Sequence, residues 1–210
     1  MVKERKSKFI LTGKLRLTGG LRLISPSGQL ARPTTGLVRE ALMNILRERL
    51  KDSNWLDLYS GSGIISCEAI EKGAKTVLAV ELNRKMFKTC ISNLEIIGST
   101  TNTKVFINAI NTEAIRFLGE GYKKYSKETY KRLGQKAKRF NYIYIDPPYK
   151  EGKYFQALES LLDGDWVAKD CLAICEFSIT HGINLPKRWQ IKDKKKYGKT
   201  GLFFLTPNQA

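Results

Sequence analysis

The sequence predicts an α/β fold: a doubly wound, mostly parallel sheet with an antiparallel C-terminal edge and a small N-terminal extension of a β-hairpin and a helix. From Trp55 onward, short apolar runs alternate with helical stretches, a pattern typical of parallel strands joined by helices. Two apolar runs near the C-terminus flank a turn rich in lysine and glycine, which indicates an antiparallel pair. The 210 residues, 42% of them hydrophobic, suffice for one substantial core.

The N-terminal extension is predicted from two short patterns. Residues 15–23 alternate apolar and basic side chains around a pair of glycines, which is typical of a hairpin. Further on, Thr34 or Thr35 can cap a helix, because apolar side chains recur at helical spacing over residues 37–50. We therefore expect an extension over residues 1–52 and a main domain over residues 53–210.

The elements of the main domain follow from the same alternation. A glycine-rich turn after the first strand begins a helix, and Gly73 ends that helix. No element is predicted for the basic stretch over residues 119–141, and Lys194–Lys196 are interpreted as part of the last hairpin turn. The expected strands are residues 55–59, 76–81, 105–110, 142–146, 171–177, 189–191 and 202–205, and the expected helices run to about residue 72, over 84–97, over 112–118 and near 153–162.

The positive charge of the chain is concentrated in three segments. The chain has 37 lysines and arginines against 20 acidic residues, a formal net charge of +17. Residues 1–31, 119–141 and 186–201 each hold six more basic than acidic side chains, so the rest of the chain is nearly neutral. Clustered basic side chains bind phosphates by releasing counterions, so this pattern favours a nucleic-acid partner over a membrane surface. Solvated loops that only aid solubility are the alternative interpretation.

Other features of the composition exclude several classes of protein. No stretch approaches the ~18 consecutive apolar residues of a transmembrane helix, and no apolar segment follows the basic N-terminus as in a secretory signal. The four cysteines lack the spacing of a disulfide framework, so we expect a cytoplasmic protein. His181 is the only histidine, which excludes a multi-histidine site, and we expect no metal.

The first motif that carries chemistry is residues 57–63 (DLYSGSG), between a predicted strand and a helix. Ligands of doubly wound sheets bind beyond the carboxyl ends of the strands, where Gly61 and Gly63 let the backbone approach a ligand closely. Glu81 ends the next strand, and its carboxylate can accept hydrogen bonds from ribose hydroxyls. Because no third glycine completes a dinucleotide fingerprint, a nucleoside cofactor without a pyrophosphate fits better than NAD. A purely structural turn is the alternative.

The second motif is Asp146-Pro147-Pro148-Tyr149, at the end of the fourth predicted strand. Two successive prolines remove two backbone donors, so the turn presents the Asp146 carboxylate and the Pro147 carbonyl as acceptors. An exocyclic amine of a base offers two donors to such a pair, and Tyr149 offers a flat face for stacking. A rigid loop exit is the alternative, but the glycines and Glu81 upstream favour a functional interpretation.

Together these motifs resemble the glycine motif, ribose acid and catalytic motif of class I S-adenosylmethionine-dependent methyltransferases. More narrowly, residues 32–35 (RPTT) followed by residues 38–42 (VREAL) are similar to the signature of the RsmD family, and residues 16–20 (RLTGG) resemble its opening hairpin. That family methylates the N2 amine of a guanine in bacterial small-subunit ribosomal RNA. Gly36 departs from the family pattern, in which an aspartate is common, and residues 119–141 are longer and more basic than usual.

The resemblance implies a role for individual residues. Asp146 and the Pro147 carbonyl would hold the guanine amine for direct methyl transfer, without a metal or a histidine. The implied catalytic residues are Asp146, Pro147, Pro148 and Tyr149. The implied cofactor-binding residues are Asp57, Tyr59, Ser60, Gly61, Gly63, Glu81, Leu82 and Glu113, with Asn111 as the second choice beside the adenine. Substrate contacts are assigned to Arg16, Arg22, Arg32, Thr34, Thr35, Arg39 and Asn44, with ordinary helix salt bridges as the alternative for Arg32 and Arg39.

The implied function is transfer of a methyl group from S-adenosylmethionine to the N2 amine of a guanine in 16S ribosomal RNA. The expected partner is ribosomal RNA within a small subunit or its assembly intermediate, and a monomer is the default expectation. Two other functions stay open: an adenine-N6 methyltransferase acting on DNA or RNA, and a non-enzymatic RNA-binding protein of the same fold.

Overall fold

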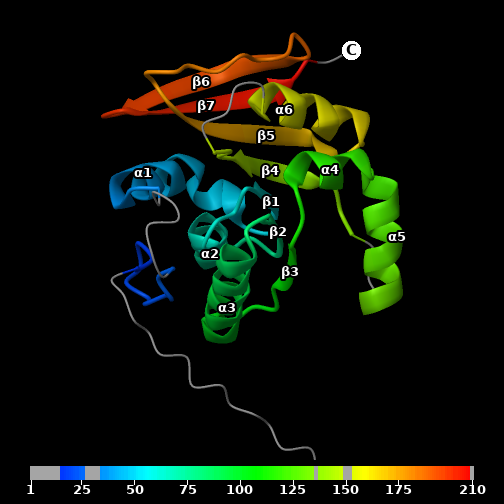
Figure 1. The fold of residues 1–210 in the computed structure, drawn as a ribbon. Coiled ribbons are helices and arrows are strands. Elements are labelled where there is room, and N and C mark those ends of the chain that lie inside the picture. The colour runs from blue at the N-terminus through cyan, green and yellow to red at the C-terminus, as the bar shows by residue number, and fades with distance from the viewer. Residues whose placement is uncertain (1–14, 27–33, 135–136, 149–152, 209–210) are drawn as a thin grey trace, which may run out of the picture.

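A computed structural model describes residues 15–26, 34–134, 137–148 and 153–208, and its strands form a seven-stranded sheet in the order β3-β2-β1-β4-β5-β7-β6. The five strands from β3 to β5 are parallel, whereas β7 is antiparallel to both β5 and β6 (Figure 1). This is the mostly parallel sheet with an antiparallel edge that the sequence predicts. The strands are β1 (Asn54–Leu58), β2 (Thr76–Val80), β3 (Phe106–Ile110), β4 (Phe140–Ile145), β5 (Val167–Ser178), β6 (Trp189–Tyr197) and β7 (Thr200–Pro207).

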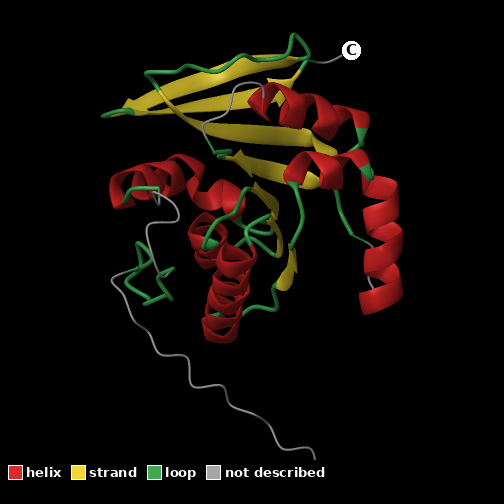
Figure 2. Ribbon diagram, in the orientation of Figure 1, coloured by secondary structure: helices red, strands yellow, loops and turns green. Residues whose placement is uncertain are grey.

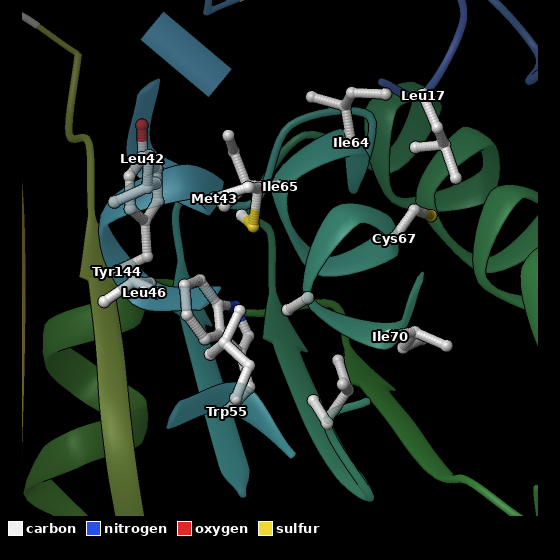
Figure 3. Close-up of a cluster of buried hydrophobic side chains, with 14 of the residues drawn as sticks. Leu17, Leu42, Met43, Leu46, Trp55, Ile64, Ile65, Cys67, Ile70 and Tyr144 are labelled. Atoms are coloured by element: carbon white, nitrogen blue, oxygen red, sulfur yellow. The ribbon is translucent and has the colours of Figure 1, made fainter. Parts of the chain in front are cut away.

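Helices cover both faces of the sheet (Figure 2). Alternate side chains of each strand point to opposite faces, so Trp55 of β1 enters one core while Leu56 enters the other. Figure 3 shows the first core, where Trp55 and Tyr144 lie beside residues of the helices that follow the N-terminal hairpin. The first face carries α1 (Gly36–Leu46), the short 3-10 helix η1 (Arg47–Leu50), α2 (Ile64–Glu71) and α3 (Arg84–Thr100); the second carries α4 (Ala114–Gly119), α5 (Tyr122–Leu133) and α6 (Lys153–Asp163).

Residues 15–26 form the predicted hairpin and pack on the first face, next to α2 and α3 (Figure 1). Leu17 N–H donates to the Leu21 carbonyl at 3.0 Å, and Leu23 N–H donates to the Leu15 carbonyl at 2.9 Å. Leu17 and Leu23 are buried in the same core as α1 and α2. The described part of the extension therefore shares a core with the main domain, and the division at residue 52 stays a prediction.

A buried ion pair joins the hairpin, α1 and α2. The Arg39 Nη1 atom lies 2.7 Å from Glu68 Oε1 and 2.9 Å from the Arg16 carbonyl. Glu68 is fully buried and also accepts hydrogen bonds from the backbone N–H and the hydroxyl of Thr18. Arg39 was predicted as an RNA or cofactor contact, with a helix salt bridge as the alternative. The structure places its guanidinium in the ion pair with Glu68, where it is the cation that compensates a carboxylate removed from water.

The structure departs from the expected elements at two basic segments. Residues 122–133 form α5, which was not predicted because its inward side chains, including Tyr125 and Thr129, are interleaved with lysines that hide the apolar stripe. The interpretation of Lys194–Lys196 as a turn is wrong: β6 continues to Tyr197, and these lysines lie on the exposed edge strand. Charged side chains on an edge strand discourage pairing with other molecules, so their polarity is compatible with a strand.

No helix in the described ranges is long and apolar enough to cross a membrane. The same part of the chain brings no three His, Cys, Asp or Glu side chains together as a metal site.

Candidate active site

The carboxyl ends of β1, β2 and β4 meet at one edge of the sheet. Leu58 of β1 pairs in register with Val80 of β2 and with Ile145 of β4. The glycine-rich loop, Glu81 and Asp146 directly follow these three residues in the sequence, so the sheet brings both predicted motifs to the same edge. This is where ligands bind in doubly wound sheets.

The glycine-rich loop is held by the side chain of Glu81. The Gly61 N–H donates to Glu81 Oε2 at 2.8 Å, and the Asn83 N–H donates to Glu81 Oε1 at 2.7 Å. Burial raises the pKa of the Glu81 carboxyl. Each carboxylate oxygen can accept more than one hydrogen bond, so Glu81 keeps acceptor capacity for the two hydroxyls of a ribose. Gly61, with φ +56, presents its backbone beside that carboxylate.

Gly63 is required by the close approach of α3 to the loop. Its φ is +75, and a Cβ atom there would lie 2.7 Å from Cys90 Sγ and 3.4 Å from the Cys90 Cα. Ser60 also faces α3, since its Oγ lies 3.6 Å from Cys90 Sγ in a buried contact. The side chain of Ser60 therefore contributes to the packing of the loop against α3.

Gly63→Ala is expected to lower the free energy of unfolding by about 2–4 kcal/mol, because a left-handed backbone strain adds to a clash in a packed core. Gly182→Ala is the matched control, since Gly182 has φ +63 but no atom within 4 Å of the added Cβ. Urea unfolding of the two variants separates clash from strain. Equal losses in both variants would show that the approach of Cys90 does not matter.

Asp57 lies beneath the loop and is almost fully buried. The Ser66 hydroxyl donates to Asp57 Oδ2 at 2.6 Å, which links β1 to α2. Burial, with a smaller contribution from the charge of Glu81, raises the pKa of Asp57 to about 7. The carboxyl thus supports the loop from the sheet side.

The raised pKa of Asp57 predicts that stability falls as the pH rises. Between its ordinary pKa of 3.8 and about 7, the folded chain binds a proton that the unfolded chain has lost. Raising the pH from 5 to 8 removes that proton, and we expect a loss of about 2–3 kcal/mol in the free energy of unfolding from this group. In Asp57→Asn this component of the pH dependence should vanish, as measured by urea unfolding at both pH values. The exposed Asp163→Asn is the control, and an identical pH dependence in Asp57→Asn and the wild type would contradict the prediction.

Asp146 is half-buried at the end of β4, beside β5. Burial, followed by the charges of Glu176 and Asp57, raises the pKa of the Asp146 carboxyl well above its usual range. In the described ranges, no ion pair involves Asp57 or Asp146. Pro147 is buried and Pro148 is exposed, whereas Tyr149 lies outside the described residues. Among the residues that the structure describes, the carboxylates of Asp57 and Asp146 therefore have no cationic partner.

Glu113, the first choice for an adenine contact, already has two partners. It caps α4 by accepting from the Arg116 N–H at 2.7 Å, and its Oε1 lies 3.1 Å from Lys153 Nζ. Burial and the charge of Glu113 raise the pKa of Tyr59, whose buried hydroxyl has no hydrogen-bond partner in the described part of the chain. The second choice, Asn111, donates to the carbonyls of Glu81 and Leu82 at 2.8 and 2.9 Å and thereby holds the chain after β2. The side chain of Leu82 itself is 64% exposed.

The predicted substrate residues are spread over the first face. Thr35 caps α1, and Thr34 Oγ1 lies 3.4 Å from the Tyr144 hydroxyl. Asn44 is exposed and lines a hollow with Asp52 and Lys75, which precede β1 and β2, so it lies at the opposite edge of the sheet from Asp146. Arg16 and Arg22 are exposed on the hairpin, and Arg32 lies outside the described residues.

Two of the basic segments, the β6–β7 turn and α5, lie at opposite ends of the parallel strands. Thr200 follows the β6–β7 turn and pairs with Ser178 at the carboxyl end of β5, so this turn lies at the edge that carries Asp146. Tyr122, at the start of α5, lines a hollow with Asn54 and Asn141 at the amino ends of β1 and β4. Figure 1 shows α5 far from the tip of the β6–β7 hairpin.

One residue beside the site was missed by the sequence analysis. Glu176 is an acidic residue in the otherwise apolar stretch 171–177 of β5, and it is only 8% exposed. It accepts a hydrogen bond from the Tyr144 hydroxyl. A charge within a buried strand is an unusual pattern, and that signal could have identified it.

Comparison with known proteins identifies the family. The model of the family described as conserved hypothetical protein 95 matches residues 10–206. The chain belongs to this family. It is the family that the sequence analysis called RsmD, so that prediction is confirmed.

Relatives in the RsmD family are similar along most of the chain. The ribosomal RNA small subunit methyltransferase D of Escherichia coli strain K12 is 28% identical over 193 residues, which cover 90% of this chain and 87% of the relative. The putative rRNA methyltransferase YlbH of Bacillus subtilis is 30% identical over 187 residues, covering 87% and 91% of the two chains. The solved structure of the putative methyltransferase yhhF from Escherichia coli superposes with a TM-score of 0.72 at 27% identity, covering 93% of this chain and 98% of that one. The predicted class I methyltransferase fold is thereby confirmed.

Proposed function

We propose that this chain transfers a methyl group from S-adenosylmethionine to the N2 amine of a guanine in small-subunit ribosomal RNA. The observation that carries the proposal is the meeting of two motifs at one sheet edge: the loop held by Glu81, and the acceptors Asp146 and Pro147. The names of the RsmD-family relatives support small-subunit ribosomal RNA as the substrate. We further propose that the chain acts as a cytoplasmic monomer on a small subunit or its assembly intermediate.

The residues of the glycine-rich loop fit a nucleoside cofactor. The Glu81 carboxylate would bind the ribose hydroxyls, and Gly61 leaves the backbone open for close approach. Tyr59 contributes a partly buried ring and a buried hydroxyl next to Glu113. S-adenosylmethionine, when bound, supplies an electrophilic methyl group on a sulfonium sulfur.

Asp146 and Pro147 would orient the amine that accepts the methyl group. The lone pair of a guanine amine is delocalised into the ring, so the nitrogen is a weak nucleophile. Two acceptors that bind both amine protons favour a tetrahedral nitrogen whose lone pair points away from them, toward the loop. This contribution is orientation and electrostatic stabilisation. Asp146, whose raised pKa makes it a stronger base than an exposed aspartate, would take the proton that the nitrogen loses.

The proposal is tested by nucleoside mass spectrometry. Small subunits from cells that lack this protein are incubated with the pure protein and labelled S-adenosylmethionine, and their RNA is digested and mapped. We expect labelled N2-methylguanosine at one position of the small-subunit RNA. N6-methyladenosine without N2-methylguanosine would favour the adenine enzyme, and a protein that binds RNA but never binds the cofactor in calorimetry would favour the non-enzymatic alternative.

RNA binding is expected to weaken steeply with salt. If about six phosphates contact basic side chains, the affinity falls by about 10³-fold between 50 and 200 mM salt, while cofactor affinity stays nearly constant. We expect the double variant Lys194→Ala/Lys196→Ala to reduce this salt dependence more than Lys127→Ala/Lys131→Ala on α5, because the β6–β7 hairpin lies at the edge of the site. A fluorescence titration at several salt concentrations measures both slopes. If the RNA affinity is insensitive to salt, the basic segments serve only the solubility of the protein.

A further inference from the structure

Glu176 lies near the site, on the strand beside Asp146, and the proposed mechanism gives it no role. Ile145 of β4 pairs in register with Cys175 of β5, so the next residues, Asp146 and Glu176, are neighbours at the carboxyl ends of two parallel strands. Tyr144 and Ile174 precede them by two positions, and both belong to the first core. Because side chains alternate along a strand, Asp146 and Glu176 point to the same face.

Glu176 is fixed by tyrosines on two elements. The Tyr144 hydroxyl donates to Glu176 Oε2, and the Tyr154 hydroxyl donates to the Glu176 carbonyl at 2.6 Å. Tyr144 is almost fully buried, and Thr34 Oγ1 contacts its hydroxyl at 3.4 Å. Figure 3 shows Tyr144 projecting from its strand beside Leu42 of α1. These contacts leave the Glu176 side chain little freedom, so its position relative to Asp146 is defined by packing.

The carboxylates of Asp146 and Glu176 together favour a base that offers several adjacent hydrogen-bond donors. Neighbouring strands lie about 4.8 Å apart, so two side chains in register can contact adjacent nitrogen atoms of a single base. The Watson–Crick edge of guanine presents the N2 amine next to the N1–H donor. Adenine presents its N6 amine next to N1, which is an acceptor. A carboxylate beside the one that binds the amine therefore attracts the guanine edge and repels the adenine edge.

We propose that Glu176 is the residue that makes this site specific for guanine, by accepting the N1–H hydrogen bond while Asp146 and Pro147 bind the N2 amine. This inference rests on the proposed function and adds the basis of its choice between guanine and adenine. Glu176 acts in recognition of the target base, and Tyr144 is a positioning residue that orients the Glu176 carboxylate. Reading a base by its Watson–Crick edge requires that the base be removed from its stack.

The experiment replaces guanine at the mapped target position with 2-aminopurine, which keeps the N2 amine but has an acceptor at N1. Wild type, Glu176→Gln and Tyr144→Phe are compared by kcat/KM on the two small-subunit substrates, assembled from ligated RNA. The exposed Glu95→Gln is the control variant. The fluorescence of 2-aminopurine, which increases when the base leaves its stack, gives a second readout that does not depend on methyl transfer.

Wild type and Glu95→Gln are expected to prefer guanine by about 30-fold or more, the scale of one hydrogen bond to a charged group. In Glu176→Gln the preference should fall at least about tenfold, because the amide can donate to the N1 acceptor of 2-aminopurine. The fluorescence on binding should rise correspondingly, and Tyr144→Phe should give an intermediate preference. Cofactor binding measured by calorimetry should equal that of wild type in both variants.

The possible failures are distinguishable. Methyl transfer to guanine with an unchanged guanine preference in Glu176→Gln would overturn the role of Glu176 and leave the proposed function intact. Failure of the wild type to methylate guanine, with cofactor and RNA both bound, would overturn the proposed function and with it the role of Glu176.

Discussion

Asp146→Ala is expected to lower kcat/KM for methyl transfer by about 10²–10³-fold or more, the usual loss when one preorganised stabilising group is removed. In the proposed mechanism, the variant lacks an acceptor of the amine and the base that would take its proton. Asp146→Asn should retain part of the activity, because its amide oxygen still accepts one hydrogen bond. Single-turnover transfer of labelled methyl groups to small subunits measures both variants.

The control for Asp146→Ala is Asp163→Ala, which removes an exposed aspartate from α6. Cofactor and RNA affinity should change little in Asp146→Ala, so the loss should appear in the chemical step. The acidic limb of the wild-type pH profile should lie above the pKa of an ordinary aspartate, because burial and the neighbouring carboxylates raise the pKa of Asp146 and only its ionised form can take the proton of the amine. Undiminished transfer by Asp146→Ala would remove this residue from the mechanism.

The second large effect is expected on stability, at the ion pair between Arg39 and Glu68. Arg39→Met leaves a fully buried carboxylate without its cation, and we expect a loss of about 3–5 kcal/mol in the free energy of unfolding. Glu68→Leu should cost a similar amount, because it leaves the Arg39 guanidinium buried and uncompensated. The double variant should be more stable than either single variant, since replacing a whole buried pair by apolar side chains is often neutral.

Urea unfolding of the four proteins completes a double-mutant cycle, which isolates the coupling between the two side chains. Thr18 also donates two hydrogen bonds to Glu68, so the hairpin should loosen when Glu68 is replaced. Hydrogen exchange of the Leu17 and Leu23 amides would detect that loosening. Strictly additive losses would show that the pair makes no specific contribution.

Several features of the fold could be predicted from the sequence because they depend on local patterns. The strands β1 to β4 and helices α2 and α3 coincide with the expected ranges to within a few residues. The spacing of apolar residues differs clearly between these strands and helices, and glycines mark several of the turns between them. The hairpin over residues 15–23 follows from its alternation and its two glycines. In contrast, α5 and the full length of β6 were not predicted, because both segments are rich in exposed lysines and their sequences show no clear periodic pattern of apolar residues.

Which side chains meet at the candidate site depended on the packing of elements that are distant in the chain. The motifs at residues 57–63 and 146–149 predicted at which edge of the sheet the site lies. Each motif follows a strand with a glycine turn or with prolines, and so marks the carboxyl end of that strand. The position of Glu176 depends on the register between β4 and β5, which no local pattern specifies. Similarly, Glu113 pairs with Lys153 across 40 positions, a contact that the sequence analysis did not foresee.

The sequence by itself determined the α/β fold, the family resemblance and the three basic segments, because these depend on residue types and their spacing. Only the tertiary structure decided what individual polar and charged side chains do. Arg39 and Asn44 belong to the same helical stretch, yet Arg39 is buried against Glu68 and Asn44 is exposed at the far edge of the sheet. The β6–β7 hairpin lies at the edge of the sheet that carries Asp146, whereas α5 begins at the opposite edge of the sheet. The physical reason is that charge interactions act through space over a few ångströms, and distances in space are set by how strands and helices pack.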